Sequence, residues 1–153
     1  PATPSDTPFL LAFTAATGVF KAFEVETLGE VLADYHEYNH KEGDGAFLLV
    51  DETEKILGFV YFAEEPMTEN SWLLWWIVVR PDCQGAGHGT TLLQFVEKTA
   101  KERGARVLFI ETSSLPHYEP TRRFYLKHNY ELEATLRDYY AAGDDMVVFR
   151  KVL

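Results

Sequence analysis

The sequence contains a single cysteine, Cys83, among its 153 residues. One thiol cannot form an internal disulfide, which suits a reducing compartment, so we expect a cytoplasmic protein. Long apolar runs are also absent, since the strongest, 72–79, is far shorter than the roughly 20 residues that a membrane span needs. The opening residues, PATPSD, lack the basic segment of a signal peptide. We therefore expect no membrane association.

Basic side chains are scarce. The chain has 14 Lys and Arg against 24 Asp and Glu, with a formal net charge of −10. Nucleic acids and anionic membranes attract basic surfaces, so this balance argues against both as partners. An acidic surface is compatible with a cationic substrate, although solubility explains it more readily. Repeats and low-complexity linkers are absent too, and the length suits a single domain over 1–153.

Apolar periodicity predicts an alternation of helices and strands. Apolar residues at steps of three and four predict helices at 5–18, 22–40, 90–103 and 119–129. β-Branched and aromatic runs predict strands at 46–52, 56–65, 71–79, 105–114, 131–141 and 146–153. The run 71–79 is apolar on both faces, which indicates a central strand. The strand–helix–strand crossover that follows it requires a parallel pair, so we predict a mixed α/β fold.

A glycine-rich loop, QGAGHG at 84–89, joins this central strand to the next helix. The dinucleotide fingerprint would need a third glycine at Thr90, and the P-loop would need Gly-Lys-Ser/Thr, so neither pattern fits. The remaining pattern is Gln-x-x-Gly-x-Gly at a helix N-terminus, where free N–H groups and the helix dipole attract an anion. By spacing alone, a turn that only reverses the chain explains the glycines equally well.

Two segments together are similar to one enzyme family. VVRPDCQGAGHGTTLL resembles the acetyl-CoA signature of the GNAT N-acetyltransferase superfamily, and RRFYLKHNYE resembles its later A-x-x-[LF]-Y-x-x-x-G-[FY] segment. The resemblance covers roughly residues 45 to 151. It implies a GNAT fold, with a central mixed, mostly antiparallel sheet, a splayed parallel pair and flanking helices. The family usually begins with a strand, whereas this chain enters a helix almost at once, so we expect that first strand to be missing or very short.

The resemblance implies acetyl-CoA as cosubstrate and no metal. In this family the loop binds the CoA diphosphate through main-chain N–H groups, and the preceding strand offers its backbone to pantetheine and the acetyl carbonyl. Arg103 or Lys101 is a candidate for the adenosine phosphate. Carried over by position, the expected cofactor contacts are Ile77, Val78, Val79, Gln84, Gly85, Ala86, Gly87, His88, Gly89, Thr90 and Tyr125.

Acetyl transfer to an amine also needs an acid and a base. Tyr125 matches the family's helix tyrosine near the CoA sulfur, which implies a general acid, while a purely packing role is the alternative. Many relatives carry a basic carboxylate on the central strand, but this strand has none. We rank Glu111 first as base because it follows the next strand into the cleft; holding the amine or pairing with an arginine are its alternatives. His117 and Asp138 are weaker candidates.

The aromatic and acidic side chains expected to line the acceptor site indicate the chemical class of the acceptor. They suit a small primary amine with apolar or cationic character. We expect this amine to attack acetyl-CoA directly in a ternary complex, because Cys83 precedes the loop and is poorly placed for a covalent step. A non-catalytic acyl-CoA-binding module and a protein or peptide acetyltransferase remain alternatives. The aromatic last strands permit a homodimer. The predicted acceptor residues are Trp75, Glu111, His117, Tyr118 (where relatives often have Asn) and Tyr139, within a wider set of Phe20, Phe23, Glu24, Glu26, Tyr35, Asp138, Tyr140, Asp144 and Asp145.

Overall fold

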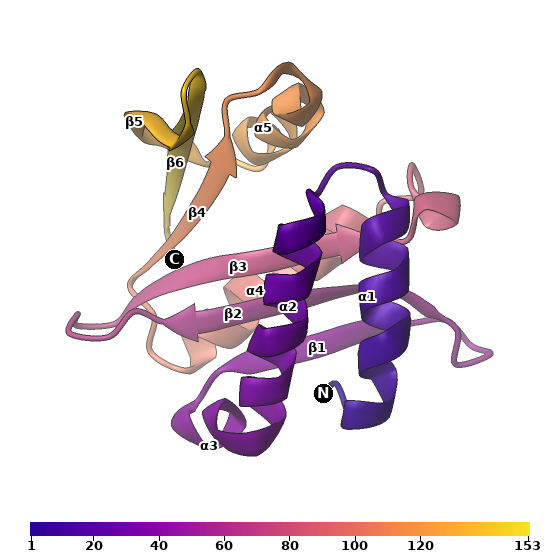
Figure 1. The fold of residues 1–153 in the computed structure, drawn as a ribbon. Coiled ribbons are helices and arrows are strands. Elements are labelled where there is room, and N and C mark those ends of the chain that lie inside the picture. Colours follow the sequence, from indigo (N-terminus) through magenta and orange to yellow (C-terminus); the bar gives the residue numbers. More distant parts are fainter.

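One six-stranded sheet runs through the protein, with helices on both of its faces (Figure 1). The computed structural model describes residues 1–153. The strand order is β1-β2-β3-β4-β6-β5, and β3 with β4 is the parallel pair in an otherwise antiparallel sheet. The strands are β1 (Gly45–Val50), β2 (Ile56–Glu64), β3 (Ser71–Val79), β4 (Val107–Ser113), β5 (Glu131–Ala141) and β6 (Asp144–Val152).

The helices divide the apolar core into two clusters, one on each face of the sheet. In Figure 1, α1 (Thr7–Ala16) and α2 (Ala22–Asp34) lie in front of the sheet, while α4 (His88–Glu102) lies behind it. The α1/α2 cluster includes Phe59, Tyr61 and Val78 from the strands. The α4 cluster also includes Tyr125 from α5 (Glu119–Lys127). Strands β1, β2 and β3 therefore contribute side chains to both clusters, in keeping with their alternating geometry, while β4 and β6 contribute to the α4 cluster.

Most predicted elements are present, with small changes at their ends. Helix α4 begins at His88 instead of 90, because the left-handed Gly87 already serves as its N-cap. Strand β6 begins at Asp144 instead of 146, so the hairpin turn before it is shorter than expected. The long second helix ends as a π-helical turn, Tyr35–Asn39, followed by the short α3 (His40–Glu42). A 3₁₀ turn, Pro116–Tyr118, leads into α5.

The N-terminal residues lie at the outer edge of β1. The Ala2 N–H donates to the Ala46 carbonyl at 2.8 Å, and the chain then passes through a 3₁₀ turn, Pro4–Asp6, into α1. The first strand along the described chain is therefore β1. The hydrogen bond from Ala2 to Ala46 lies at the sheet edge where the family resemblance would place an earlier strand.

The parallel pair separates halfway along its length. β3 and β4 pair only from Ser71–Leu74 to Val107–Ile110. Beyond that point 76–79 pair with β2 alone and 111–113 with β6 alone, and Figure 1 shows β4 turning away from β3 toward α5. A β-bulge lies at the separation: pairing with β2 shifts so that Trp75 is the extra residue of β3. The splayed parallel pair is thus confirmed.

Strand β5 forms the free edge of the sheet beyond β6. Nearly all of its residues are exposed, including the apolar Leu132 and Leu136. Its pairing with β6 is interrupted between Leu136 and Ala141, where the chain bulges outward. An exposed edge of this kind can pair with another chain, and homodimerisation through the last strands stays a prediction.

Candidate active site

The loop before α4 presents a row of unpaired backbone donors. No N–H group from Gly85 to Thr90 has an acceptor within the protein; the first bond of the helix runs from the Thr91 N–H to the Gly87 carbonyl at 3.1 Å. We call these six residues, 85–90, the N–H cradle. Unpaired donors and the positive end of the helix dipole both favour an anion there.

The three glycines of the cradle differ in backbone conformation and surroundings. Gly85 and Gly87 have left-handed backbones, with φ of 84° and 81°, and a Cβ on either would meet nothing within 4 Å. Gly89 has an ordinary backbone, but its Cβ would lie 3.4 Å from Cζ of Phe124 on α5. The first two therefore permit the left-handed turns and leave open space beside the backbone, while a side chain at the third would contact Phe124. The Gln84 amide donates to the Val79 carbonyl at 3.3 Å and ties the loop to β3.

Unpaired backbone groups of this kind match the chemistry of acetyl-CoA. A diphosphate suits the N–H cradle, and an extended amide-bearing arm suits the gap between β3 and β4. Within 75–79, alternate residues direct N–H and C=O groups away from β2, toward a side where no strand receives them. Ile77, Val78 and Val79 lie on this stretch, as predicted, although their contact with a cofactor stays a prediction.

Tyr125 is a buried tyrosine that keeps a free hydroxyl. Its side chain is 3% exposed and packs against the rings of Tyr130 and Phe149, at centroid distances of 5.9 and 5.6 Å. No protein group bonds its hydroxyl, and the hydroxyl is not among the fully enclosed unpaired polar atoms, so it retains contact with solvent-accessible space. Burial raises the pKa of Tyr125, which keeps it protonated at neutral pH, as a proton donor must be.

Glu111 lies on β4 just past the point where β3 and β4 separate. It pairs with Val148 of β6, whereas its neighbour Ile110 points into the α4 cluster. Strand alternation therefore directs Glu111 to the face that α1 and α2 cover. Burial raises the pKa of Glu111, and the negative charge of Glu65 raises it further. A carboxylate with a raised pKa accepts a proton more readily than an ordinary one.

The acid and base candidates lie on opposite faces of the sheet. Tyr125 belongs to the α4 cluster, while Glu111 points to the α1/α2 face. An intact sheet would separate them by a continuous wall of backbone. Here the backbone wall is interrupted, because β3 and β4 are not paired beyond Leu74 and Ile110.

The bulge at Trp75 places two adjacent tryptophans on the same face. The Trp75 ring lies 5.8 Å from that of Tyr61, which belongs to the α1/α2 cluster. The Trp76 ring lies 5.1 Å from that of Phe20, which packs against the same cluster. Regular alternation would have pointed one of them to the opposite face. Trp75 remains 48% exposed, so part of its ring is available to a ligand.

Tyr118 joins the start of α5 to the loop between α1 and α2. Its hydroxyl donates to the Val19 carbonyl at 3.4 Å, bringing together segments far apart in the chain. Burial raises the pKa of Tyr118 to about 12, with smaller contributions from the charges of Glu24 and Asp144. His117 stacks beside it at 4.5 Å but is exposed. We call the α1/α2 side of the sheet around Trp75 and Glu111 the acceptor face. Tyr118 borders this face from the side of α5.

The bulged tip of the last hairpin supplies two more tyrosines. Tyr139 and Tyr140 are 57% and 44% exposed and pack edge to face at 5.2 Å. Asp138 supports the bulge: it has a left-handed φ of 56°, and its carboxylate accepts from the Gly143 N–H at 2.8 Å. Burial raises the pKa of Tyr140, and the charge of Glu111 raises it further, so the hairpin tip lies close to the candidate base.

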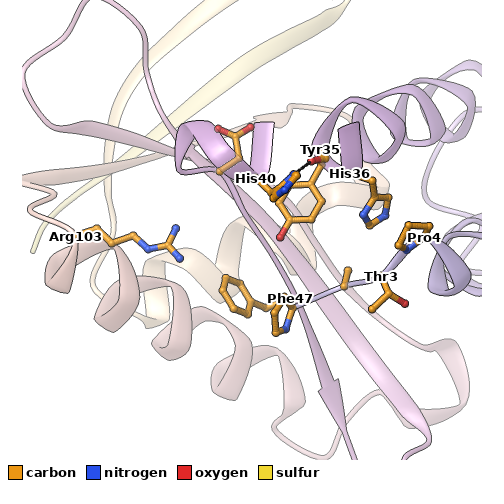
Figure 2. Close-up of a pocket in the computed structure, with 10 residues that line it drawn as sticks. Thr3, Pro4, Tyr35, His36, His40, Phe47 and Arg103 are labelled. Atoms are coloured by element: carbon orange, nitrogen blue, oxygen red, sulfur yellow. Dashed lines mark hydrogen bonds between the residues drawn. The ribbon is translucent and has the colours of Figure 1, made fainter. Parts of the chain in front are cut away.

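Two residues lie elsewhere than expected. Tyr35 is 6% exposed within the α1/α2 cluster, so it does not line the acceptor face. Arg103 is the C-cap residue of α4, and at a rise of 1.5 Å per residue it lies about 22 Å from the cradle. Its guanidinium donates to the Gly43 carbonyl at 2.8 Å. Figure 2 shows both beside a separate pocket of about 440 Å³, with His36, His40 and Phe47. This pocket lies at the start of β1, the sheet end opposite the cradle.

Neither a metal centre nor a membrane segment is found among the described residues. No group of three or more His, Cys, Asp or Glu side chains is arranged to hold a metal ion. None of the helices combines the length and apolar character needed to cross a bilayer.

Comparison with known proteins establishes the class. A model of the acetyltransferase (GNAT) family matches residues 14–130, more than half of the chain. The chain therefore belongs to the GNAT acetyltransferases, acyltransferases that take the acetyl group from acetyl-CoA. A search of curated proteins gave no match.

Solved structures agree with this assignment. A protein assigned to the GNAT acetyltransferases, from Desulfovibrio desulfuricans, is 30% identical over 99% of this chain and 95% of its own, with a TM-score of 0.93. A ribosomal-protein-alanine N-acetyltransferase from Brucella melitensis is 24% identical over 99% and 97%, with a TM-score of 0.80. An aminoglycoside 6′-N-acetyltransferase in complex with coenzyme A is 19% identical over 98% and 92%, with a TM-score of 0.75. The last two share the fold.

Sequence reasoning missed two residues near the site. Glu65 follows β2, yet its charge acts on Glu111, and no motif connects the two. Phe124 was visible only as a neighbour of Tyr125, although its ring sets the space available at Gly89. Both effects arise from packing between elements distant in sequence.

Proposed function

We propose that this acetyltransferase transfers the acetyl group of acetyl-CoA to a primary amine of a small molecule, by direct attack within a ternary complex. One observation carries the proposal. Unpaired backbone donors lie where β3 leads into α4, and Tyr125 and Glu111, whose pKa values are both raised, lie on opposite faces of the sheet where β3 and β4 separate.

The protons balance with these two groups. Glu111 takes a proton from the acceptor ammonium, directly or through a water, so that the amine nitrogen can attack the thioester carbonyl carbon. The new C–N bond forms and the C–S bond breaks. Tyr125 gives its proton to the departing sulfur, and backbone N–H groups of 75–79 stabilise negative charge on the carbonyl oxygen. The attacking nitrogen loses its second proton as the intermediate collapses, and this proton replaces, through solvent, the one that Tyr125 gave, so that the net proton released is the one on Glu111. Cys83, which precedes the loop, takes no part.

The acceptor face favours a compact, cationic amine. Exposed aromatic rings of Trp75, Tyr139 and Tyr140 provide flat apolar surface, and rings of this kind attract cations. The charges of Glu24 and Asp144 act on Tyr118, although the Asp144 carboxylate is buried and accepts a hydrogen bond from the Ser113 hydroxyl. The contact of Tyr118 with the α1–α2 loop crosses this region, which favours a small acceptor over an extended peptide.

An amine panel tests the proposal. We expect small primary amines to release CoA from acetyl-CoA above the rate without amine, with acetylated product identified by mass spectrometry. Peptides with N-terminal alanine form the second arm, since one structural neighbour is a ribosomal-protein-alanine N-acetyltransferase. Turnover with peptides alone would contradict the small-molecule acceptor. CoA binding without turnover in either arm would instead indicate a non-catalytic binding module.

Replacing Tyr125 by Phe tests the general acid. We expect Tyr125→Phe to lower kcat by at least about tenfold while the Kd for acetyl-CoA stays within about twofold, because the ring still fills its buried position. Steady-state kinetics and calorimetry measure the two effects. Tyr38→Phe, on the exposed π-helical turn, is the matched control. An unchanged kcat would remove Tyr125 from the acid role.

The charge of Glu65 provides a test by pH. A base works only when deprotonated, so activity falls as the pH drops through the pKa of Glu111, which lies above its usual value. Glu65→Gln removes one of the two causes of that elevation. We therefore expect the acidic limb of the kcat profile to move to lower pH, while partial desolvation keeps the pKa of Glu111 above its usual value. A limb that stays in place or moves upward would contradict this assignment.

A further inference from the structure

A histidine from α5 contacts the N–H cradle. Thr90 is the last residue of the cradle, and its hydroxyl oxygen lies 3.1 Å from Nε2 of His128. His128 follows the last turn of α5 as its C-cap residue. This contact joins the anion-binding end of α4 to the C-terminal end of α5, and the predicted cofactor set does not include His128.

The His128 ring is held in place from two directions. It packs edge to face on Phe124 at 4.6 Å, and the same Phe124 ring limits the space at Gly89 in the cradle. Its backbone carbonyl accepts from Lys151 Nζ at 3.1 Å, and Lys151 in turn forms a 2.7 Å ion pair with Glu97 of α4. The position of the ring therefore depends on α4, α5 and β6 together, and the Lys151 bond does not involve the ring.

The contact determines where the Thr90 hydroxyl proton points. A hydroxyl has one proton to donate and can accept in return. If Nε2 of His128 carries a proton, it donates a hydrogen bond to the Thr90 hydroxyl oxygen, and the hydroxyl proton points elsewhere. If Nε2 is unprotonated, the Thr90 hydroxyl donates its hydrogen bond to the ring. A diphosphate in the cradle favours the first state, because the hydroxyl then donates a charge-assisted bond to it.

We propose that His128 is a positioning residue of the CoA diphosphate site, which orients the Thr90 hydroxyl as a donor toward the diphosphate. The inference rests on the proposed use of acetyl-CoA by this chain. It adds a side-chain donor to a cradle otherwise made of backbone. His128 acts through Thr90 and has no role in the acetyl transfer itself.

Calorimetric titration with CoA tests this inference, in wild type, His128→Phe, His128→Gln, Thr90→Val and the double variant His128→Phe/Thr90→Val. We expect His128→Phe to weaken CoA binding by about fivefold, because the ring can still pack on Phe124 but donates nothing. His128→Gln retains an N–H donor and should stay within about twofold. The double variant should bind about as weakly as Thr90→Val alone, because both changes remove one interaction.

The controls separate positioning from general damage. Melting temperatures without CoA report any loss of stability, and Lys127→Ala, an exposed neighbour, reports the effect of a nearby charge. Additive losses in the double variant, equal losses in His128→Gln and His128→Phe, or an unchanged Kd in His128→Phe would each overturn the positioning role. Failure of the wild type to bind CoA would overturn the proposed function, and this inference with it.

Discussion

Glu111→Gln is expected to lower kcat/KM for the amine by about 10²- to 10³-fold, while the Kd for acetyl-CoA changes less than about twofold. Glutamine keeps the size of the side chain and its place on β4 but cannot accept the proton of the acceptor. Acetyl-CoA should be unaffected, because Glu111 points to the α1/α2 face and the N–H cradle opens at the start of α4. Steady-state kinetics with the best amine of the panel, and calorimetry with acetyl-CoA, measure the two quantities.

A matched control is Glu133→Gln. Glu133 is exposed and is the unpaired residue where the β5–β6 pairing shifts, so its replacement removes one negative charge away from the gap. We expect it to leave kcat/KM within about twofold. If Glu111→Gln lost no more activity than this control, Glu111 would not be the base. A loss confined to KM for the amine would instead assign Glu111 to holding the substrate.

Gly87→Val is expected to weaken CoA binding by about 100-fold or more. Its backbone is left-handed, with φ of 81°, and a β-branched residue in that conformation costs roughly 1–3 kcal/mol. The open space beside its Cα is the concavity in which the diphosphate would lie, so the new side chain would also occupy the site. Calorimetric titration with CoA measures the loss directly.

Gly143→Val separates strain from obstruction. Gly143 has nearly the same φ, 79°, and also has nothing within 4 Å of its Cβ position, but it lies in the β5–β6 turn. We expect a comparable decrease in melting temperature for both variants and weaker CoA binding only for Gly87→Val. Equal CoA affinity in the two variants would show that the cradle does not receive the diphosphate.

The order of elements and the unpaired donors of the N–H cradle were predictable because both depend on local signals. Apolar spacing marks the helices and strands, and glycines at fixed intervals before a helix mark a close approach of the backbone. The bulge at Trp75 was not predictable, because a run of nine largely apolar residues has no alternation that could reveal a change of register. The contact between Tyr118 and Val19 depends on how α5 and the α1–α2 loop meet in space.

The wrong placements also have a physical reason. Tyr35 continues the apolar face of the second helix, so sequence alone cannot distinguish a core aromatic from one that lines a pocket. Arg103 could have been rejected from the length of α4, because its fifteen residues separate the two helix ends by more than 20 Å. A basic residue near a motif in sequence is therefore a weak candidate when a helix lies between them.

The extra residue at Trp75 has a consequence for how this enzyme can vary. It reverses the alternation of side chains along β3. Before it, the even-numbered Trp72 and Leu74 face the α4 cluster, and after it the even-numbered Val78 faces the α1/α2 cluster. Deleting one residue there would turn every later side chain of the strand to the opposite face. The residues that lead into the N–H cradle would turn with them. Substitutions can reshape the acceptor face, but the length of this strand is far less free to change.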